Sequence, residues 1–366
     1  MPTYLRTQHF IPTSVLNEYF VTMKKIAYYL LLASFVACNN KSENPDVSKI
    51  AVNLATKRFD EQFFHIDTLK LEQSLTGVQQ QFPQFLNLFL QNIVGVDNPQ
   101  AIKTFYALYK PVYDSSQSIY KDFSSVEKEI RQAFQYVKYY FPSYKLPETI
   151  IPIIGPMNSR EDLARMASGD YSPNFIGPDF IGISLQFYLG PNFSLYNTAY
   201  FINNVAPLYR SRRFSKEYIA ADVMKLVTDD IFPDKSNTKP LIEQMIEKGK
   251  QWWLLDKVMP DTPDSIKTGY TQHQLDWCKA NEGLIWSTII KNENLYSLQP
   301  ATIQTYIGEA PFTSVFSQED SPGNIGAWIG WQMVKKFEEA KPDMKIDAIM
   351  RAPAKQILEE GKYKPK

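Results

Sequence analysis

The sequence predicts an α+β fold that is mostly helical and contains a small sheet. Two β-branched runs bounded by proline and glycine, residues 148–155 and 175–185, are typical of buried central strands. A third run, within residues 50–64, predicts a short strand near Arg58 and Phe59. Most of the remaining chain carries apolar residues at helical spacing, which predicts helices packed over this sheet.

Residues 67–139 are predicted to be helical because their apolar residues, such as Leu71 and Leu75, recur every three or four positions. One helix of this region is expected to begin near Ser124 and to end before Pro142. After a tyrosine-rich loop that follows the second strand region, further helices are expected at 216–229, 239–257, 271–291, 324–340 and 353–360.

The N-terminal residues have the pattern of a bacterial lipoprotein signal. Two lysines precede a stretch of twelve residues that is apolar apart from Ser34, and this stretch leads directly to Cys38. Twelve residues rise only about 18 Å as a helix, which is too short for the roughly 30 Å hydrocarbon core of a bilayer. Phe35, Val36 and Ala37 resemble a lipobox, so the mature chain is expected to begin at a lipid-modified Cys38.

This pattern divides the chain into four expected parts. Residues 1–22 reflect an upstream start codon chosen in error, 23–37 form the signal peptide, 38–49 a polar tether, and 50–366 a single globular domain. Because two or more acyl chains hold a protein stably on a bilayer, the protein is expected to stay on its membrane and to face the periplasm.

The composition of the mature chain excludes several classes of function. Residues 1–37 contain three basic and one acidic side chain, so 36 basic and 38 acidic side chains remain. Such a balance provides no electrostatic footprint for nucleic acid. Cys278 is the only cysteine besides Cys38, which excludes an intrachain disulfide once Cys38 is lipidated. Since no glycine-rich phosphate loop occurs, no nucleotide cofactor is expected.

The last third of the chain carries short motifs in a fixed order. They are Met245, Ile246, Gly249, Lys250, Leu254, Leu255, Asp256; Gly269, Tyr270, Thr271, Trp277, Cys278; Asn281, Glu282, Ile285, Trp286; Leu295, Tyr296, Ser297; Ala310, Pro311, Phe312; Ser321, Pro322, Gly323, Ile325, Gly326, Trp328, Ile329, Gly330; and Tyr363, Lys364, Pro365. With these motifs, the chain from about Arg58 to Lys364 resembles the gliding-motility-associated lipoprotein GldB family of Bacteroidota.

The resemblance implies a membrane-anchored accessory protein needed for gliding and, by association, for the type IX secretion machinery. Its partners would then be envelope proteins of that machinery, together with the membrane that holds the lipid on Cys38. The family is also similar in outline to zinc peptidases of the gluzincin type. In such enzymes one helix bears HExxH and a later helix supplies a glutamate ligand.

The residues needed for that zinc chemistry are incomplete in this sequence. The helix predicted at 216–229 contains no histidine, although Glu243 and Glu247 on the next helix could stand where the third ligand stood. Without two imidazoles, these residues cannot assemble a tetrahedral zinc site. Three acids on the first helix could hold a harder cation, but exposed helix-face acids are the commoner explanation: Asp222, Asp229 and Asp230. We therefore expect a degenerate scaffold with no catalytic residue, no metal and no cofactor.

Other candidate residues have structural explanations. His65 and His273 are expected to be partly buried and hydrogen-bonded, although a triad assembled in space stays open. Glu282 is expected to bond a buried polar group or a lysine, since Asp276 lies too far along the helix to share a glycosidase site with it.

The tryptophans and glycines of the last third are expected to serve packing. All six tryptophans lie there, and a helical core accounts for them. Gly323, Gly326 and Gly330 are spaced to let another backbone approach closely. Two alternatives of other classes stay open. One is a hydrolase acting on peptide or glycan at the same groove, and the other is a lipoprotein that captures a ligand on exposed tryptophans such as Trp252, Trp277 or Trp328.

Overall fold

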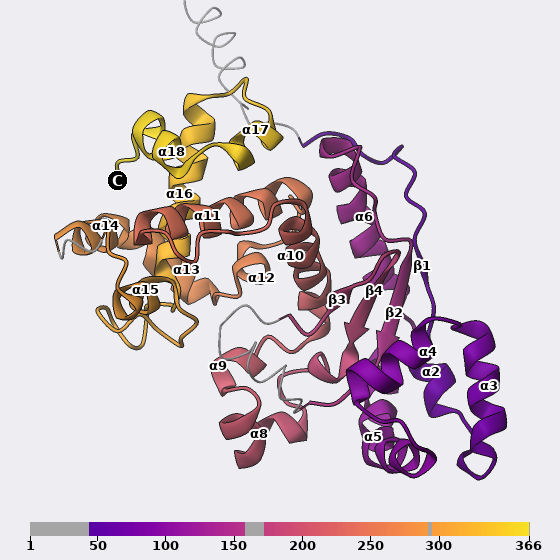
Figure 1. Ribbon diagram of the computed structural model, residues 1–366. Helices are drawn as coiled ribbons and strands as arrows, with labels where there is room; N and C mark the ends of the chain where they lie inside the picture. Colours follow the sequence, from indigo (N-terminus) through magenta and orange to yellow (C-terminus); the bar gives the residue numbers. More distant parts are fainter. Residues whose placement is uncertain (1–43, 158–171, 292–294, 366) are drawn as a thin grey trace, which may run out of the picture. The chain divides into compact units, whose positions relative to one another are not determined.

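The structure is a computed structural model that describes residues 44–157, 172–291 and 295–365 (Figure 1). Contacts divide the chain after Pro45, and every element named below belongs to the second unit, Asp46–Lys366. The upstream residues, the expected signal peptide and Cys38 lie outside the described residues. Within the described part, no helix combines the length and the apolar character that crossing a membrane requires.

Four short strands form one mixed sheet in the order β1-β2-β4-β3. β1 (Ala55–Thr56), β2 (Thr149–Ile153) and β4 (Phe180–Ser184) are parallel, whereas β3 (Phe175–Ile176) is an antiparallel edge strand. The isoleucine side chains of β2 and β4 are buried, as expected for parallel strands covered on both faces. Both predictions of a central strand region are confirmed, and the second region holds the pair β3 and β4.

The predicted strand near Arg58 and Phe59 is displaced by a few residues. β1 ends at Thr56, and helix α2 (Phe59–Phe64) begins at Phe59. Phe59 and Phe63 lie about one helical turn apart and are fully buried. The ring of Phe59 also packs edge-on against three further phenylalanine rings at centroid distances of 4.7–5.1 Å. Burial of these rings on one face therefore favours a helix over a longer strand.

The segment 67–139 is largely helical, as predicted. It contains α3 (Leu71–Gln81), α5 (Pro99–Tyr120) and α6 (Ser124–Tyr140), with a 3₁₀-helix at Thr68–Lys70, a short helix at Phe85–Asn87 (α4) and a π-helix at Leu88–Val94. The start of α6 at Ser124 and its end before Pro142 also agree with the prediction.

One face of α6 binds the segment 50–56, which leads into the sheet. Arg131 donates to the carbonyl oxygen of Val52 at 2.7 Å. Glu127 accepts hydrogen bonds from the amide and the hydroxyl of Thr56 at 3.1 and 2.7 Å. The side chains of α6 that contact this segment recur three or four residues apart: Glu127, Arg131, Gln135 and Lys138.

Most of the predicted C-terminal helices are confirmed: α10 (Ile219–Ile231), α11 (Leu241–Val258), α16 (Ile325–Ala340) and α18 (Ala354–Gly361). The helix predicted at 271–291 is instead two helices, α13 (Gln272–Ala280) and α14 (Glu282–Lys291). They separate at Asn281, whose side chain donates to the carbonyl oxygen of Trp277 at 2.9 Å and so ends α13. The sequence did not predict five short helices: α8 (Ala199–Asn204), α9 (Leu208–Ser211), α12 (Asp264–Thr268), α15 (Pro300–Ile307) and α17 (Ile346–Arg351).

Helices α11 and α16 cross one another at glycines (Figure 1). A Cβ atom added to Gly249 would lie 2.1 Å from the carbonyl carbon of Gly330. A Cβ atom added to Gly330 would lie 1.8 Å from the carbonyl oxygen of Met245. The prediction that the spaced glycines allow close backbone packing is therefore confirmed for Gly330.

Three tryptophans of the same two helices are buried. Trp253, Trp328 and Trp331 are at most 2% exposed. The indole nitrogens of Trp253 and Trp331 each donate to a carboxylate at 2.8 Å, of Glu338 and Asp256 respectively. The prediction of a core role is confirmed for these tryptophans, whereas the other three are half-buried: Trp252, Trp277 and Trp286.

Candidate functional site

Helix α10 covers most of the segment 216–229, in which the sequence lacks the two histidines of a zinc-binding helix. Its inward residues include Ala220, Ala221 and Met224, which are buried. The carboxylate of Asp222 accepts a hydrogen bond from the hydroxyl of Tyr188 at 3.0 Å and forms an ion pair with Lys225 at 2.9 Å. The two carboxylate oxygens of Asp222 thus each have a protein partner.

The other two acids of α10 point to separate partners. Asp230 accepts a hydrogen bond from the Tyr144 hydroxyl at 2.7 Å, and Asp229 accepts one from the amide of Asp234 at 3.4 Å. Across the residues that the structure describes, no group of three histidine, cysteine, aspartate or glutamate side chains is placed to hold a metal ion.

The candidate remnant ligands Glu243 and Glu247 lie one turn apart on α11. Glu247 forms an ion pair at 2.6 Å with Lys250, whose side chain is 3% exposed. Lys250 also donates to the carbonyl oxygen of Ala352 at 2.7 Å, so the pair connects α11 to the segment before α18. Burial raises the pKa of the Glu247 carboxyl, and the nearby ammonium of Lys250 opposes that rise.

Both histidines of the domain are exposed, so the prediction that they are partly buried is wrong. Each is hydrogen-bonded, as predicted: His65 Nδ1 lies 2.7 Å from the carbonyl oxygen of Glu61, and His273 Nε2 lies 2.8 Å from Asp320. Asp320 also accepts from the hydroxyl of Ser317 at 2.7 Å. Because the carboxylate lies between the serine and the histidine, this group lacks the serine–histidine contact that a hydrolytic triad requires.

Glu282 bonds a polar side chain, as predicted. The hydroxyl of Tyr363 donates to Glu282 at 2.7 Å, and the Tyr363 ring packs edge-on against Trp286 at 5.5 Å. These contacts attach the C-terminal residues to α14.

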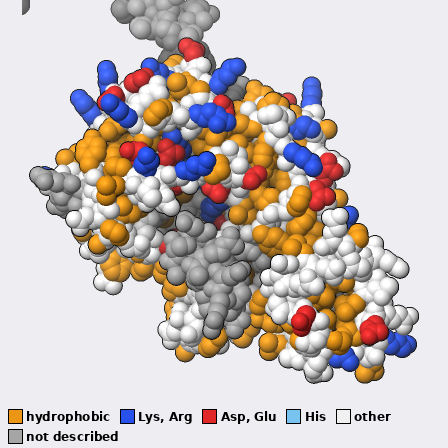
Figure 2. Space-filling view, in the orientation of Figure 1, with side chains coloured by type: hydrophobic (Ala, Val, Ile, Leu, Met, Phe, Trp, Pro, Cys, Tyr) orange, Lys and Arg blue, Asp and Glu red, His pale blue; other side chains and the backbone are white. Residues whose placement is uncertain are grey.

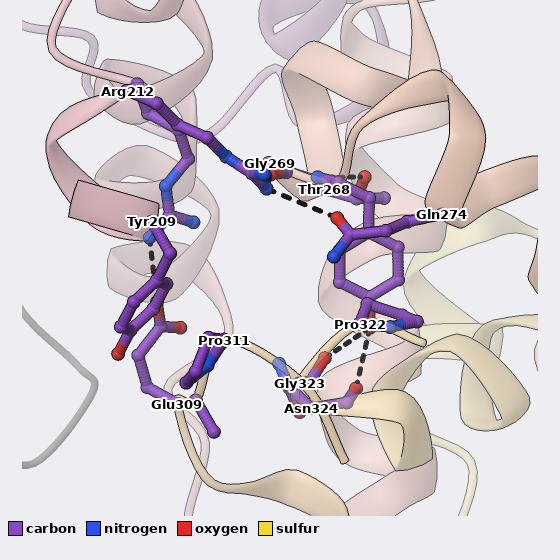
Figure 3. Close-up of a pocket in the computed structure, with 13 residues that line it drawn as sticks. Tyr209, Arg212, Thr268, Gly269, Gln274, Glu309, Pro311, Pro322, Gly323 and Asn324 are labelled. Carbon is purple, nitrogen blue, oxygen red and sulfur yellow. Dashed lines mark hydrogen bonds and ion pairs between the residues drawn. The ribbon is translucent and has the colours of Figure 1, made fainter. Parts of the chain in front are cut away.

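A polar cavity, which we call the arginine pocket, lies between four segments that are distant in sequence (Figure 3). Its volume is about 30 Å³, which is room for one or two water molecules. It is lined by Tyr209, Arg212, Arg213, Thr268, Gly269, Tyr270, Gln274, Glu309, Ala310, Pro311, Pro322, Gly323 and Asn324. Six of these residues belong to the motifs through which the sequence resembles its family: Gly269, Tyr270, Ala310, Pro311, Pro322 and Gly323.

The wall of the arginine pocket is held by close backbone contacts. Gly269 ends α12 with a positive φ of 75°, a conformation that favours glycine. A Cβ atom at Gly323 would lie 2.1 Å from the carbonyl oxygen of Ala310. The hydroxyl of Tyr270 lies 2.9 Å from the carbonyl oxygens of Gly323 and Asn324, which fixes the start of α16 against α12.

The two arginines that line the arginine pocket, Arg212 and Arg213, differ in their charged partners. Glu309 pairs with Arg213 at 2.7 Å and lies 3.7 Å from Arg210. Arg212 donates from Nη2 to two neutral acceptors, the carbonyl oxygen of Gly269 at 3.0 Å and the amide oxygen of Gln274 at 3.2 Å. Burial, and then the charge of Arg213, lower the pKa of Arg212.

Sequence reasoning did not single out the arginine pocket. The available signal was the basic run at 209–213, in which three arginines occur without an acid. Neither this pocket nor the groove lined by Val94 and Leu108 includes Trp252, Trp277 or Trp328, so the two cavities give no support to ligand capture on those tryptophans. On the face shown in Figure 2, basic and acidic side chains lie side by side, and no broad basic surface appears there.

Comparison with known protein families finds one family that this chain matches. The family model described as gliding motility protein GldB matches residues 40–365. No curated protein and no solved structure matches this chain.

Proposed function

We propose a function from the premise that this chain belongs to the GldB family of gliding motility proteins. The protein is a lipid-anchored accessory component of the gliding and type IX secretion machinery. It binds envelope proteins of that machinery on the periplasmic side and catalyses no reaction.

The pairing of candidate acids on α10 and α11 with lysines is the observation that carries this proposal. α10 lies beside both the edge strand β3 and α11. In this proposal the two helices correspond to the ligand-bearing helices of a degenerate gluzincin scaffold. On this scaffold, Asp222 is paired with Lys225, and Glu247 is paired with Lys250. Each of these carboxylates is thus satisfied by a lysine, which supports a scaffold without metal chemistry.

We expect the double variant Glu243→Gln/Glu247→Gln to remain folded and to support normal gliding. Loss of the Glu247 charge leaves Lys250 with a neutral amide and the Ala352 carbonyl, at a cost of about 1–3 kcal/mol. The measurements are thermal unfolding, metal content of the purified protein and spreading of cells on agar.

Two outcomes would contradict the non-catalytic proposal. One is a folded double variant that cannot glide. The other is a stoichiometric metal whose removal by a chelator abolishes hydrolysis of peptide or glycan, which would favour the hydrolase alternative.

The lipid anchor is proposed on Cys38, after a signal peptide at 23–37 and before a tether at 38–49, with 1–22 absent from the natural product and 50–366 as one domain. We expect Cys38→Ala to move the protein from the membrane fraction to the soluble fraction, because the acyl chains are its only anchor in this proposal. Cys278→Ala is the control, since Cys278 is fully buried and carries no lipid in this proposal. Retention of Cys38→Ala on membranes washed in high salt contradicts the anchor.

A further inference from the structure

The arginine pocket contains a cation that no carboxylate of the described residues neutralises. Among the described residues, no carboxylate lies within ion-pair distance of Arg212. Glu309 forms ion pairs with Arg213 and, at a longer distance, with Arg210. Both hydrogens of Arg212 Nη2 are used on neutral oxygens. Its Nε and Nη1 hydrogens have no acceptor among those residues, so they are available to a ligand.

A half-buried guanidinium that forms no ion pair with a described carboxylate favours the entry of an anion. Burial weakens the hydration of the charge. Charge-assisted hydrogen bonds from the guanidinium to an incoming carboxylate would replace the lost hydration. The pKa of Arg212 is lowered by burial and by the charge of Arg213, and the nearby carboxylate of Glu309 opposes this only in part.

A second, independent group in the arginine pocket lacks a partner. Asn324 lines the cavity, and its Oδ1 atom is buried without a hydrogen-bond partner in the described part of the chain. The two atoms of an amide are assigned from their partners, so the same position can present the NH₂ group to a ligand oxygen. Asn324 also begins α16, a helix of 16 residues, whose first backbone amides carry partial positive charge.

The shape of the cavity limits the anion to a small one. Figure 3 shows Arg212 at one end of the cavity, with Gln274 and Glu309 on opposite sides and Asn324 at the other end. A volume of about 30 Å³ admits a carboxylate group and little more. Because the Glu309 carboxylate lines the same cavity, a doubly charged phosphate would be repelled more strongly than a singly charged carboxylate.

We infer that the arginine pocket captures a carboxylate of a peptide segment, with Arg212 as its ion-pair partner and the amides of Asn324 and Gln274 as hydrogen-bond donors. This inference rests on the proposed function, since the segment belongs to a protein partner. The carboxylate comes either from an aspartate or glutamate side chain or from the C-terminus of the partner.

Peptide binding to the full-length protein in detergent tests the inference. The probes are acetyl-Gly-Gly-Glu-Gly-amide, which carries a side-chain carboxylate, acetyl-Gly-Gly-Gly, which carries a terminal one, and acetyl-Gly-Gly-Gly-amide, which carries none. Binding is measured by saturation-transfer NMR. We expect at least one acidic probe to bind at least about ten-fold more tightly than the neutral probe, and the preferred acidic probe identifies the source.

Substitution of Arg212 locates the binding. Arg212→Gln is expected to lower the affinity for the acidic probe about ten-fold. Arg212→Lys, which keeps the charge but not the planar guanidinium, is expected to lower that affinity less. Arg351→Gln is the matched control, because Arg351 is 66% exposed and pairs with Asp347 on the surface. Should Arg212→Gln not fold, raising NaCl from about 50 to about 500 mM in the unaltered protein is expected to weaken the same probe.

Equal binding of acidic and neutral probes, no binding of either acidic probe, or unchanged binding by folded Arg212→Gln would overturn the inference. None of these results would contradict the lipid anchor or the gliding role, which the variants of Cys38 and of Glu243 and Glu247 test separately. Cleavage of a probe, visible in the same spectra, would instead contradict the non-catalytic function and leave carboxylate binding intact.

Discussion

Replacing Gly330 by alanine is expected to lower the free energy of unfolding by about 3 kcal/mol, near the upper end of the usual cost of overpacking. The added Cβ atom would lie 1.8 Å from the carbonyl oxygen of Met245, and backbone atoms cannot rotate away as a flexible side chain can. α11 and α16 must therefore separate, which also loosens Trp253 and Trp331. Urea unfolding followed by tryptophan fluorescence measures this loss.

The control for Gly330 is Gly77, in the middle of α3, where an added Cβ atom meets nothing within 4 Å. Gly77→Ala removes the same backbone freedom without a clash, so it is expected to stabilise the protein by about 0.5–1 kcal/mol. If Gly330→Ala were as stable as Gly77→Ala, the two helices would not cross at the distance described.

Replacing Arg58 by methionine is expected to destabilise the fold by about 3–5 kcal/mol, because it leaves a buried carboxylate without its partner. Asp60 is 0% exposed, and Arg58 binds both of its oxygens at 2.8 and 2.5 Å. Arg58 also donates to the carbonyl oxygen of Tyr120 at 2.6 Å, so its loss leaves a second acceptor without a donor. Equilibrium urea unfolding at neutral pH is the measurement.

Two further variants show whether the loss of stability in Arg58→Met comes from the buried ion pair. Arg58→Met/Asp60→Leu replaces the whole pair by apolar side chains and is expected to recover most of the lost stability. Lys110→Met removes one partner of an exposed pair with Asp114 and is expected to cost less than about 1 kcal/mol. A loss for Arg58→Met as small as that for Lys110→Met would contradict the buried-pair account.

The central strands and long helices could be predicted because their signal is local. Isoleucine runs bounded by proline or glycine define β2 and β4, and the long helices α10, α11 and α16 carry apolar residues at helical spacing. One error, the single helix predicted at 271–291, arose at one side chain. Asn281 ends α13 through its own bond to Trp277, although the apolar pattern continues into α14.

The candidate site residues could be predicted only in part, because sequence spacing shows only neighbours on the same helix. The spacing of Glu243 and Glu247 placed them on one face of a helix, and Lys250, three residues after Glu247, was the available signal that the second acid is paired. The arginine pocket has no such local signature, because Arg212, Gln274 and Asn324 come from segments that meet only in the folded chain.

The contacts of α6 with residues 50–56 also determine how the protein bears mechanical load. A force applied to the chain near Asp46 reaches the sheet through β1, which is only two residues long. Glu127, Arg131, Gln135 and Lys138 hold the preceding backbone at successive points, so a pull along the segment is shared among several bonds. A pull away from α6 would break them one after another. The direction of the force thus sets the strength of the attachment.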